Sequence, residues 1–173
     1  MILCIDVAYD EQKDENKIGC ALIKDFADKV PYKTYELIKY GVHAYIPGEF
    51  YKRELPCIMH AIEHIQNDGE QIDTVIVDGY CFLDPGHIGL GEHLFQALNE
   101  NVTVIGAAKT KYKDADCVVA RNGLFITASG ITKEKAAEYI ELMHGNHKNP
   151  TILKNVDHLS RGIYKENKRP SKS

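Results

Sequence analysis

A continuous β-branched run lies near the middle of the chain: Asp73-Thr74-Val75-Ile76-Val77-Asp78, closed by Gly79. Apolar residues at successive positions are typical of a strand that is buried on both faces of a parallel sheet. A second run of this kind covers 102–106, after a helical pattern over 90–98. Strand, helix and strand in close succession indicate parallel pairing with a right-handed crossover. The middle of the chain therefore predicts the centre of an α/β sheet.

The chain before this run predicts an antiparallel meander followed by a helix. Two dense apolar runs, 1–9 and 18–23, flank a polar turn, which is a β-hairpin signature. A third strand is expected over 35–42. Over 49–65 the apolar residues recur at helical spacing, so a helix is expected there.

The chain after the central run predicts two further strands, 117–120 and 124–128, and two helices. The first of these helices opens at Thr132 and ends by Gly145, and the second covers 152–160. No internal repeat and no linker divides the sequence. We therefore expect one α/β domain with a mixed sheet, in which an antiparallel three-strand meander joins parallel strands, flanked by helices.

The composition is that of a globular protein. Of the 173 residues, 44% are hydrophobic and 27% are charged, and no apolar run approaches the roughly 20 residues that span a bilayer. We therefore expect no membrane partner. Asp6 stands where a signal peptide would still be apolar, which favours a cytoplasmic protein. The five cysteines are widely spaced and odd in number, so reduced thiols are expected.

The net charge of −4 argues against a protein that coats nucleic acid by bulk electrostatics, although it leaves room for a local basic groove. Basic residues gather at the C-terminal end, where the last thirteen residues, from Arg161, hold five basic side chains and one acid. We expect one folded domain over 1–163 and a basic tail over 164–173. The tail is either a frayed terminus or an arm that contacts phosphates.

Three acidic side chains lie where the pattern calls for apolar or inward-facing residues. Asp6 sits inside an apolar strand, where an isolated buried carboxylate is costly, so we expect a cation next to it. Asp78 ends the run 75–77, at the strand end that usually forms the ligand crevice of a parallel sheet. Glu54 lies on the inward face of its helix. Carboxylates on neighbouring elements are ligands for Mg²⁺, so these acids are candidate metal ligands.

An ordinary structural role stays open for each acid, because Asp78 can form a turn and Glu54 can pair with Lys52 or Arg53. Lys109 follows the second buried strand and is expected near the same crevice. A lysine beside carboxylates suits a site that handles phosphate, and a surface lysine is the alternative.

Asp157 and His158 lie on the last predicted helix and could add one further ligand. Adjacent helical positions point about 100° apart, so only one of the two is expected to face the site.

A competing motif is His60-Ala61-Ile62-Glu63-His64, which has the H-x-x-E-H spacing of inverted zinc peptidases. Two histidines at i and i+4 share a helix face and can bind zinc, but no distal third ligand is marked in the sequence. A zinc peptidase is therefore a distant alternative. The sequence contains neither the nucleotide-binding P-loop nor the nucleophile elbow of α/β-hydrolases.

Several short segments occur in a characteristic order over roughly residues 1–161: Asp6-Val7-Ala8-Tyr9, Tyr45-Ile46-Pro47-Gly48, Arg53-Glu54, Val77-Asp78-Gly79, Gly89-Leu90 with His93, Ile105-Gly106-Ala107-Ala108-Lys109, Ser129-Gly130, and Lys154 with Asp157. This ordered set resembles endonuclease V, a family of deoxyinosine-specific repair nucleases with a ribonuclease H-like fold. The resemblance implies a metal-dependent endonuclease that acts in DNA repair.

The resemblance also implies roles for individual residues. Its metal-binding acids correspond to Asp6, Glu54, Asp78 and Asp157, with His158 as the alternative to Asp157. Asp157 is preferred because Lys154 stands three residues before it, where the family usually has arginine. Lys109 corresponds to the active-site lysine. The implied cofactor is Mg²⁺, for which Mn²⁺ can substitute, and two ions about 4 Å apart would activate water and stabilise the leaving 3′ oxygen.

The implied substrate is DNA or RNA that contains a deaminated base, inosine or hypoxanthine, cut at the second phosphodiester bond 3′ to the lesion. The segment Tyr45-Ile46-Pro47-Gly48 resembles the family's wedge, in which a rigid turn enters the duplex and an aromatic ring stacks on bases. Gly79 and His93 fall at base-binding positions, and the base would be flipped into a pocket. A monomer is expected.

Two departures from the family pattern bear on specificity. The chain reads Asp84-Pro85-Gly86 where the family usually has His-Pro-Arg, and Tyr80-Cys81 where small or polar residues are common. Inosine in DNA, inosine in RNA and a different lesion therefore all stay open as substrates. So do two other functions: a ribonuclease H-like nuclease without preference for deaminated bases, and a nucleic-acid-binding module without turnover.

Overall fold

The computed structural model describes residues 1–41, 51–84 and 86–162. Its elements, in chain order, are β1 (Ile2–Asp10), β2 (Glu15–Ile23), β3 (Lys33–Tyr40), α1 (Tyr51–Asn67), β4 (Thr74–Val77), α2 (Leu90–Ala97), β5 (Thr103–Ala108), β6 (Val118–Ala120), β7 (Leu124–Ser129), α3 (Lys133–Leu142) and α4 (Thr151–Ser160). Each predicted strand and helix is present. The predicted starts and ends that fall within 42–50 lie outside the described residues.

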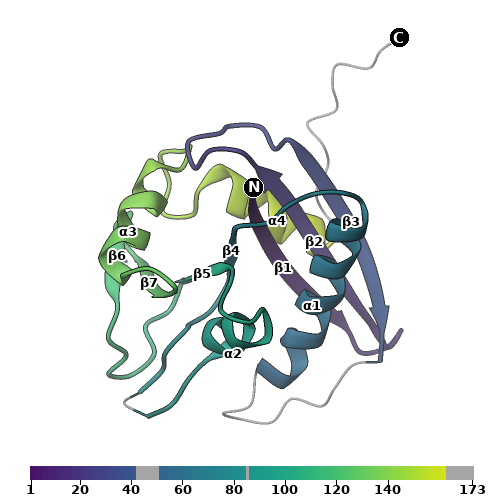
Figure 1. The fold of residues 1–173 in the computed structure, drawn as a ribbon, viewed down its shortest axis with the longest axis horizontal. Helices are drawn as coiled ribbons and strands as arrows, with labels where there is room; N and C mark the ends of the chain where they lie inside the picture. Colours follow the sequence, from purple (N-terminus) through teal and green to yellow (C-terminus); the bar gives the residue numbers. More distant parts are fainter. Residues whose placement is uncertain (42–50, 85, 163–173) are drawn as a thin grey trace.

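The strands form one mixed sheet in the order β3-β2-β1-β4-β5-β7-β6 (Figure 1). The meander β1–β2–β3 is antiparallel, and β1, β4 and β5 are parallel to one another. Beyond β5, β7 pairs antiparallel with β5, and β6 pairs antiparallel with β7 at the edge of the sheet. The expected α/β architecture is confirmed, with the parallel strands in the middle of the sheet.

Two helices cover each face of the sheet. The apolar side of α1 and α2 packs on the face that carries Leu3 and Ile5, while α3 and α4 pack on the opposite face, which carries Ile2 and Cys4. Figure 1 shows α1 and α4 on opposite sides of the β1–β2 ribbon. This two-sided burial follows from the alternation of side chains along a strand, which turns neighbouring residues of β1 to opposite faces.

The cysteines are free thiols, as expected, and four of the five are buried. None of the helices in the described part of the chain has the length and apolar character that a membrane span requires.

The register of the parallel strands places two acids side by side. Ile5 pairs with Val77 in the last parallel rung between β1 and β4. The next residue on each strand is an aspartate, Asp6 or Asp78, so the two carboxyl groups leave the sheet at the same edge and on the same face. The candidate site is therefore built where β4 and β5 end, beside the middle of the longer strand β1.

Candidate active site

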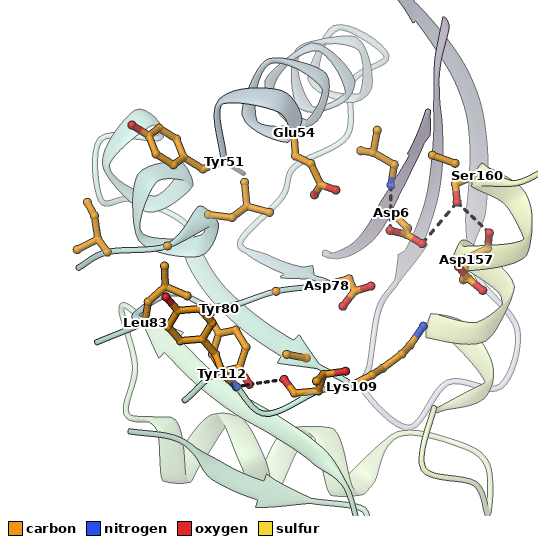
Figure 2. Close-up of a pocket in the computed structure, with 18 of the residues that line it drawn as sticks. Asp6, Tyr51, Glu54, Asp78, Tyr80, Leu83, Lys109, Tyr112, Asp157 and Ser160 are labelled. Carbon is orange, nitrogen blue, oxygen red and sulfur yellow. Dashed lines mark hydrogen bonds between the residues drawn. The ribbon is translucent and has the colours of Figure 1, made fainter. Parts of the chain in front are cut away.

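A pocket of about 620 Å³ opens at this edge of the sheet (Figure 2). Its lining has two different halves. One half carries charged side chains: Asp6, Glu54, Asp78, Lys109, Asp157 and Arg161. The other half carries aromatic and aliphatic side chains: Tyr51, Tyr80, Leu83, Ile88, Leu90 and Tyr112. A polar centre therefore lies directly beside a surface that can hold a planar ring.

Four carboxyl groups reach the pocket from four different elements or their ends. Asp6 comes from β1, Asp78 follows β4, Glu54 lies in the first turn of α1 and Asp157 lies in α4. Glu54 is only 7% exposed. Figure 2 shows the Glu54 carboxyl group directed from α1 toward the space that Asp6 and Asp78 face from the sheet. Residues that are far apart in the sequence thus form one acidic cluster.

The Asp6 carboxyl group is hydrogen-bonded to a backbone amide and lies near a hydroxyl group. Its carboxyl group accepts a hydrogen bond from the Val7 amide at 3.0 Å, and the Ser160 hydroxyl lies 3.5 Å from its second oxygen. In the described residues no basic side chain forms an ion pair with Asp6, so the cation that the sequence predicts beside it is not a salt-bridged side chain of this part of the protein. Burial, and then the charge of Asp78, raise the pKa of Asp6 to about 7.

The pKa values of the neighbouring acids, Glu54 and Asp78, are raised as well. Burial raises the pKa of Glu54 well above its usual range, and the charges of Asp6 and Asp78 raise it further. Burial also raises the pKa of Asp78, against the opposing effect of Lys109. An electropositive ligand at this position would relieve the repulsion among the three carboxylates.

The alternative role of Glu54, an ion pair with Arg53, is not found. Arg53 pairs with Glu11 at 3.4 Å, and its guanidinium lies 3.7 Å from the centre of the Tyr9 ring. The charge of Arg53 still lowers the pKa of Glu54, but Arg53 forms its ion pair with Glu11, and the Glu54 carboxyl group lines the pocket.

Lys109 follows the last residue of β5, next to Asp78 in the adjacent strand. Figure 2 shows its side chain extending from the strand end toward the carboxyl groups of α4 and β4. It lines the pocket together with these acids. An ammonium group in this place can stabilise negative charge on a bound phosphate.

The apolar half is held in place by one buried tyrosine. The Tyr80 hydroxyl donates a hydrogen bond to the Thr110 carbonyl at 2.6 Å and accepts one from the Tyr112 amide at 3.0 Å. Gly79, just before it, also lines the pocket and has a φ of 148°, which favours glycine. Tyr80, which the sequence marked only as a departure, therefore ties the wall of the pocket to the segment that follows Lys109.

Among the described residues, two predicted site residues are not part of the pocket lining. The His93 ring stacks on Tyr51, with ring centroids 3.6 Å apart, and Tyr51 rather than His93 lines the pocket. On α4, Asp157 lines the pocket and His158 is not among its described lining residues. The predicted wedge, Tyr45-Ile46-Pro47-Gly48, lies outside the described residues.

The sequence reasoning missed some pocket residues altogether. Tyr51, Leu83, Ile88 and Tyr112 belong to no motif, and only their aromatic or branched character next to motif residues could have marked them. Ser160 and Arg161 follow Asp157 by three and four residues, which is one helical turn. Arg161 pairs with Asp157 at 2.6 Å, so this spacing was the available signal.

The zinc motif does not form a metal site. His60, Glu63 and His64 are exposed on the outer side of α1, and the His64 ring meets Tyr35 edge-on. Within the described residues, no three histidine, cysteine, aspartate or glutamate side chains are placed to hold a zinc ion. The zinc-peptidase alternative therefore has no structural support.

The carboxyl groups of the acidic cluster also do not surround a common metal position. Among the described residues, no three of them are placed to bind one ion together. Mg²⁺ usually keeps several waters and takes only one or two carboxylates from a protein, together with phosphate oxygens from a substrate. The donor set is made of hard carboxylate oxygens and carries unbalanced negative charge. It therefore fits Mg²⁺ bound partly through water and phosphate.

The architecture has close counterparts among solved structures. Endonuclease V from Streptomyces avermitilis aligns with a TM-score of 0.73 at 19% identity, covering 93% of this chain and 79% of that one. Ciona intestinalis Endonuclease V, in complex with a 23mer DNA containing an inosine followed by a ribo-adenosine, aligns with a TM-score of 0.75 at 14% identity, covering 93% and 83%. The protein therefore has a ribonuclease H-like fold.

The sequence comparison narrows this class to one family. The family model of Endonuclease V matches residues 1–164. Endonuclease V of Pyrococcus horikoshii is 29% identical over 174 residues, which cover 98% of this chain and 78% of that protein. The chain belongs to the endonuclease V family, which confirms the resemblance seen in the sequence. The family is one of nucleases, so its chemistry is phosphodiester hydrolysis.

Proposed function

We propose that this protein is a Mg²⁺-dependent endonuclease that hydrolyses a phosphodiester bond 3′ to a deaminated base, inosine or hypoxanthine, in DNA or RNA. The observation that carries the proposal is the convergence of four carboxyl groups and Lys109 on one edge of the sheet, beside an apolar pocket. Family membership and the inosine-containing DNA bound by the Ciona intestinalis relative support the same reaction and substrate.

Asp6, Glu54, Asp78 and Asp157 are the residues that would hold the metal. When bound, Mg²⁺ supplies positive charge to the phosphate oxygens and makes water a better nucleophile at neutral pH. The raised pKa values of Asp6, Glu54 and Asp78 favour this assignment, because burial and then neighbouring negative charges raise them, and a bound cation would stabilise the ionised carboxylates. Manganese has similar ligand preferences and is expected to substitute.

The remaining pocket residues position the substrate. Lys109 places its ammonium group beside the phosphate and stabilises the charge that develops there. The aromatic rings of Tyr51, Tyr80 and Tyr112 offer a surface for a base that has left the duplex stack, where a stacked base contributes about 1–3 kcal/mol. Gly79 has no side chain to keep that base from the backbone.

The test is cleavage of end-labelled strands by the purified protein with Mg²⁺, using single- and double-stranded DNA and RNA with or without one inosine. We expect a discrete cut 3′ to inosine, lost in Asp6→Ala and in Asp78→Ala. The strand that is cut fastest identifies the preferred substrate.

Two other outcomes would each replace the proposal. Equal cutting of strands with and without inosine would indicate a nuclease without preference for deaminated bases. Binding of inosine-containing strands by the wild type, without cutting of any of them, would indicate a binding module.

We further propose that residues 1–163 form a single catalytic domain that acts as a monomer, with 164–173 as a basic tail. A chain that ends at residue 163 is expected to keep the cleavage pattern, and sedimentation should give the mass of one chain. A truncated chain that loses cleavage but stays folded would assign the tail to substrate binding instead.

A further inference from the structure

The backbone of Lys109 is held from outside the pocket by a second lysine. The Lys148 ammonium group donates a hydrogen bond to the Lys109 carbonyl at 3.0 Å. Lys148 lies in the connection between α3 and α4, and it is not among the described residues that line the pocket. It therefore reaches the site only through the peptide group of Lys109.

The Lys148 side chain passes close to a glycine. Gly123, in the turn between β6 and β7, lies under the aliphatic stem of Lys148. A β-carbon at Gly123 would stand 3.0 Å from Cε and 3.1 Å from Cδ of Lys148, which is tighter than ordinary contact. The bare backbone at this position lets the stem pass close to the turn and extend to Lys109.

The loop that carries Lys148 is itself fixed to the same turn. The Arg121 guanidinium donates to the carbonyl of Met143 at 2.9 Å, to that of His147 at 2.7 Å and to that of Gly145. Its Nε also lies 3.3 Å from the Lys148 carbonyl. One arginine thus satisfies successive carbonyl groups of the α3–α4 connection, which orders the loop without regular secondary structure.

We propose that Lys148 is a positioning residue for the reaction: anchored by Arg121 and seated over Gly123, it fixes the peptide group of Lys109 and so the direction of the Lys109 side chain. The proposal rests on the proposed function, because it concerns the lysine assigned to the phosphate. Lys109 follows the end of β5, where the regular ladder no longer holds the backbone. Tyr80 holds the next residues from inside the pocket, and Lys148 holds Lys109 from outside.

The test replaces Lys148 with methionine, which keeps most of the aliphatic stem and removes the donor. We expect kcat for inosine-containing strands to fall about three- to tenfold with little change in KM, because a misdirected Lys109 weakens stabilisation of the transition state more than binding. Lys148→Arg keeps a donor and is expected to recover part of kcat. Lys29→Met is the matched control, because it removes an exposed lysine that is not among the described pocket-lining residues and leaves the Lys109 peptide untouched.

A double-mutant cycle separates positioning from direct contact with nucleic acid. In a Lys109→Ala background, Lys148→Met is expected to cause no further loss of kcat. An equal loss of kcat in both backgrounds, or a change in KM with kcat unchanged, would overturn the proposal.

Amide hydrogen exchange gives a readout that does not depend on activity. In Lys148→Met, faster exchange is expected over 109–112 and unchanged exchange in β1 and β4. Unchanged exchange over 109–112 would overturn the positioning role even if the wild type cleaves inosine-containing strands. If exchange over 109–112 is faster in Lys148→Met but the wild type cuts no strand, the role of Lys148 in holding the Lys109 peptide is supported and the proposed function is rejected.

Discussion

At the scale of single residues, the site is defined by acids that the fold forces together. Asp6 and Asp78 are neighbours because they follow a paired rung of two parallel strands, and Glu54 meets them from α1. Burial and then the charges of neighbouring acids raise the pKa of each of these carboxyl groups, so without a bound cation their ionised form is disfavoured. These buried acids therefore cost folding stability where they are ionised, and a bound cation would offset that cost.

This cost gives stability a defined dependence on pH. The pKa of Asp6 is raised from 3.8 to about 7, so between these values the folded protein binds more protons than the unfolded chain. Stability is therefore lost as the pH rises from about 4 to about 7. In metal-free buffer at pH 8, Asp6→Asn is expected to be more stable than the wild type by roughly 1–3 kcal/mol.

Urea unfolding at a series of pH values measures this difference, which should shrink toward pH 4. Asp114→Asn, which removes an exposed charge, is the control. A difference that stays constant over the whole pH range would contradict the assignment.

A second prediction concerns the Tyr80 hydroxyl. Tyr80→Phe keeps the ring in the pocket wall but leaves the Thr110 carbonyl and the Tyr112 amide without their partner. The free energy of unfolding is expected to fall by about 1–3 kcal/mol. Tyr112→Phe is the comparison, because Tyr112 takes part through its backbone amide and should lose much less. Equal losses in the two variants, measured by chemical denaturation, would assign the effect to the rings instead.

At the scale of elements, the close approach of α4 to the sheet places Asp157. Gly19 in β2 is where this approach is closest: a β-carbon there would stand 2.7 Å from both the Ser160 amide nitrogen and the Val156 carbonyl oxygen. The helix backbone therefore packs directly on the strand. Since Asp157 lies between these contacts on α4, the separation of helix and sheet sets its distance from Asp6.

Gly19→Ala is accordingly expected to push α4 away from β2. Overpacking of this kind should cost about 1–3 kcal/mol of unfolding free energy. Cleavage is expected to fall by about tenfold or more, because Asp157 and Ser160 move with the helix. Lys17→Ala, in the same strand, is the control. Thermal unfolding together with cleavage rates tests this, and a destabilised variant with unchanged kcat would show that the position of α4 does not matter for the reaction.

At the scale of the whole molecule, one sheet edge gathers the charged groups from β1, β4, β5, α1 and α4. Binding of Mg²⁺ at this edge should therefore stabilise the entire fold, since the metal binds the folded state and not the dispersed residues of the unfolded chain. At a Mg²⁺ concentration about ten times its dissociation constant, the gain is about 1.4 kcal/mol, or about 3–6 °C in Tm.

Differential scanning calorimetry in metal-free buffer and with added Mg²⁺ measures this shift. Asp78→Asn should show a clearly smaller shift than the wild type, while Asp73→Asn, at the other end of the same strand, should match the wild type. Equal shifts in all three proteins would place the ion elsewhere.

Much of the fold could be predicted from the sequence, because its signals are local. The β-branched run before Asp78 and the helical spacing around Glu54 each depend on residues within a few positions of one another. The same holds for the family segments, which predicted the acids and Lys109 as site residues. The apolar half of the pocket could not be predicted in this way, because Tyr51 and Tyr112 come from distant segments and have no shared spacing.

The sequence by itself determined the elements, their order and the chemical types available to the site. Only the tertiary structure decided which of those groups meet: that Tyr51 and not His93 faces the pocket, that Arg53 pairs with Glu11, and that Lys148 holds Lys109. The physical reason is the distance along the sequence over which each interaction acts. Strand and helix patterns arise from neighbours along the chain, whereas a pocket is made by packing elements whose separation in the sequence carries no signal.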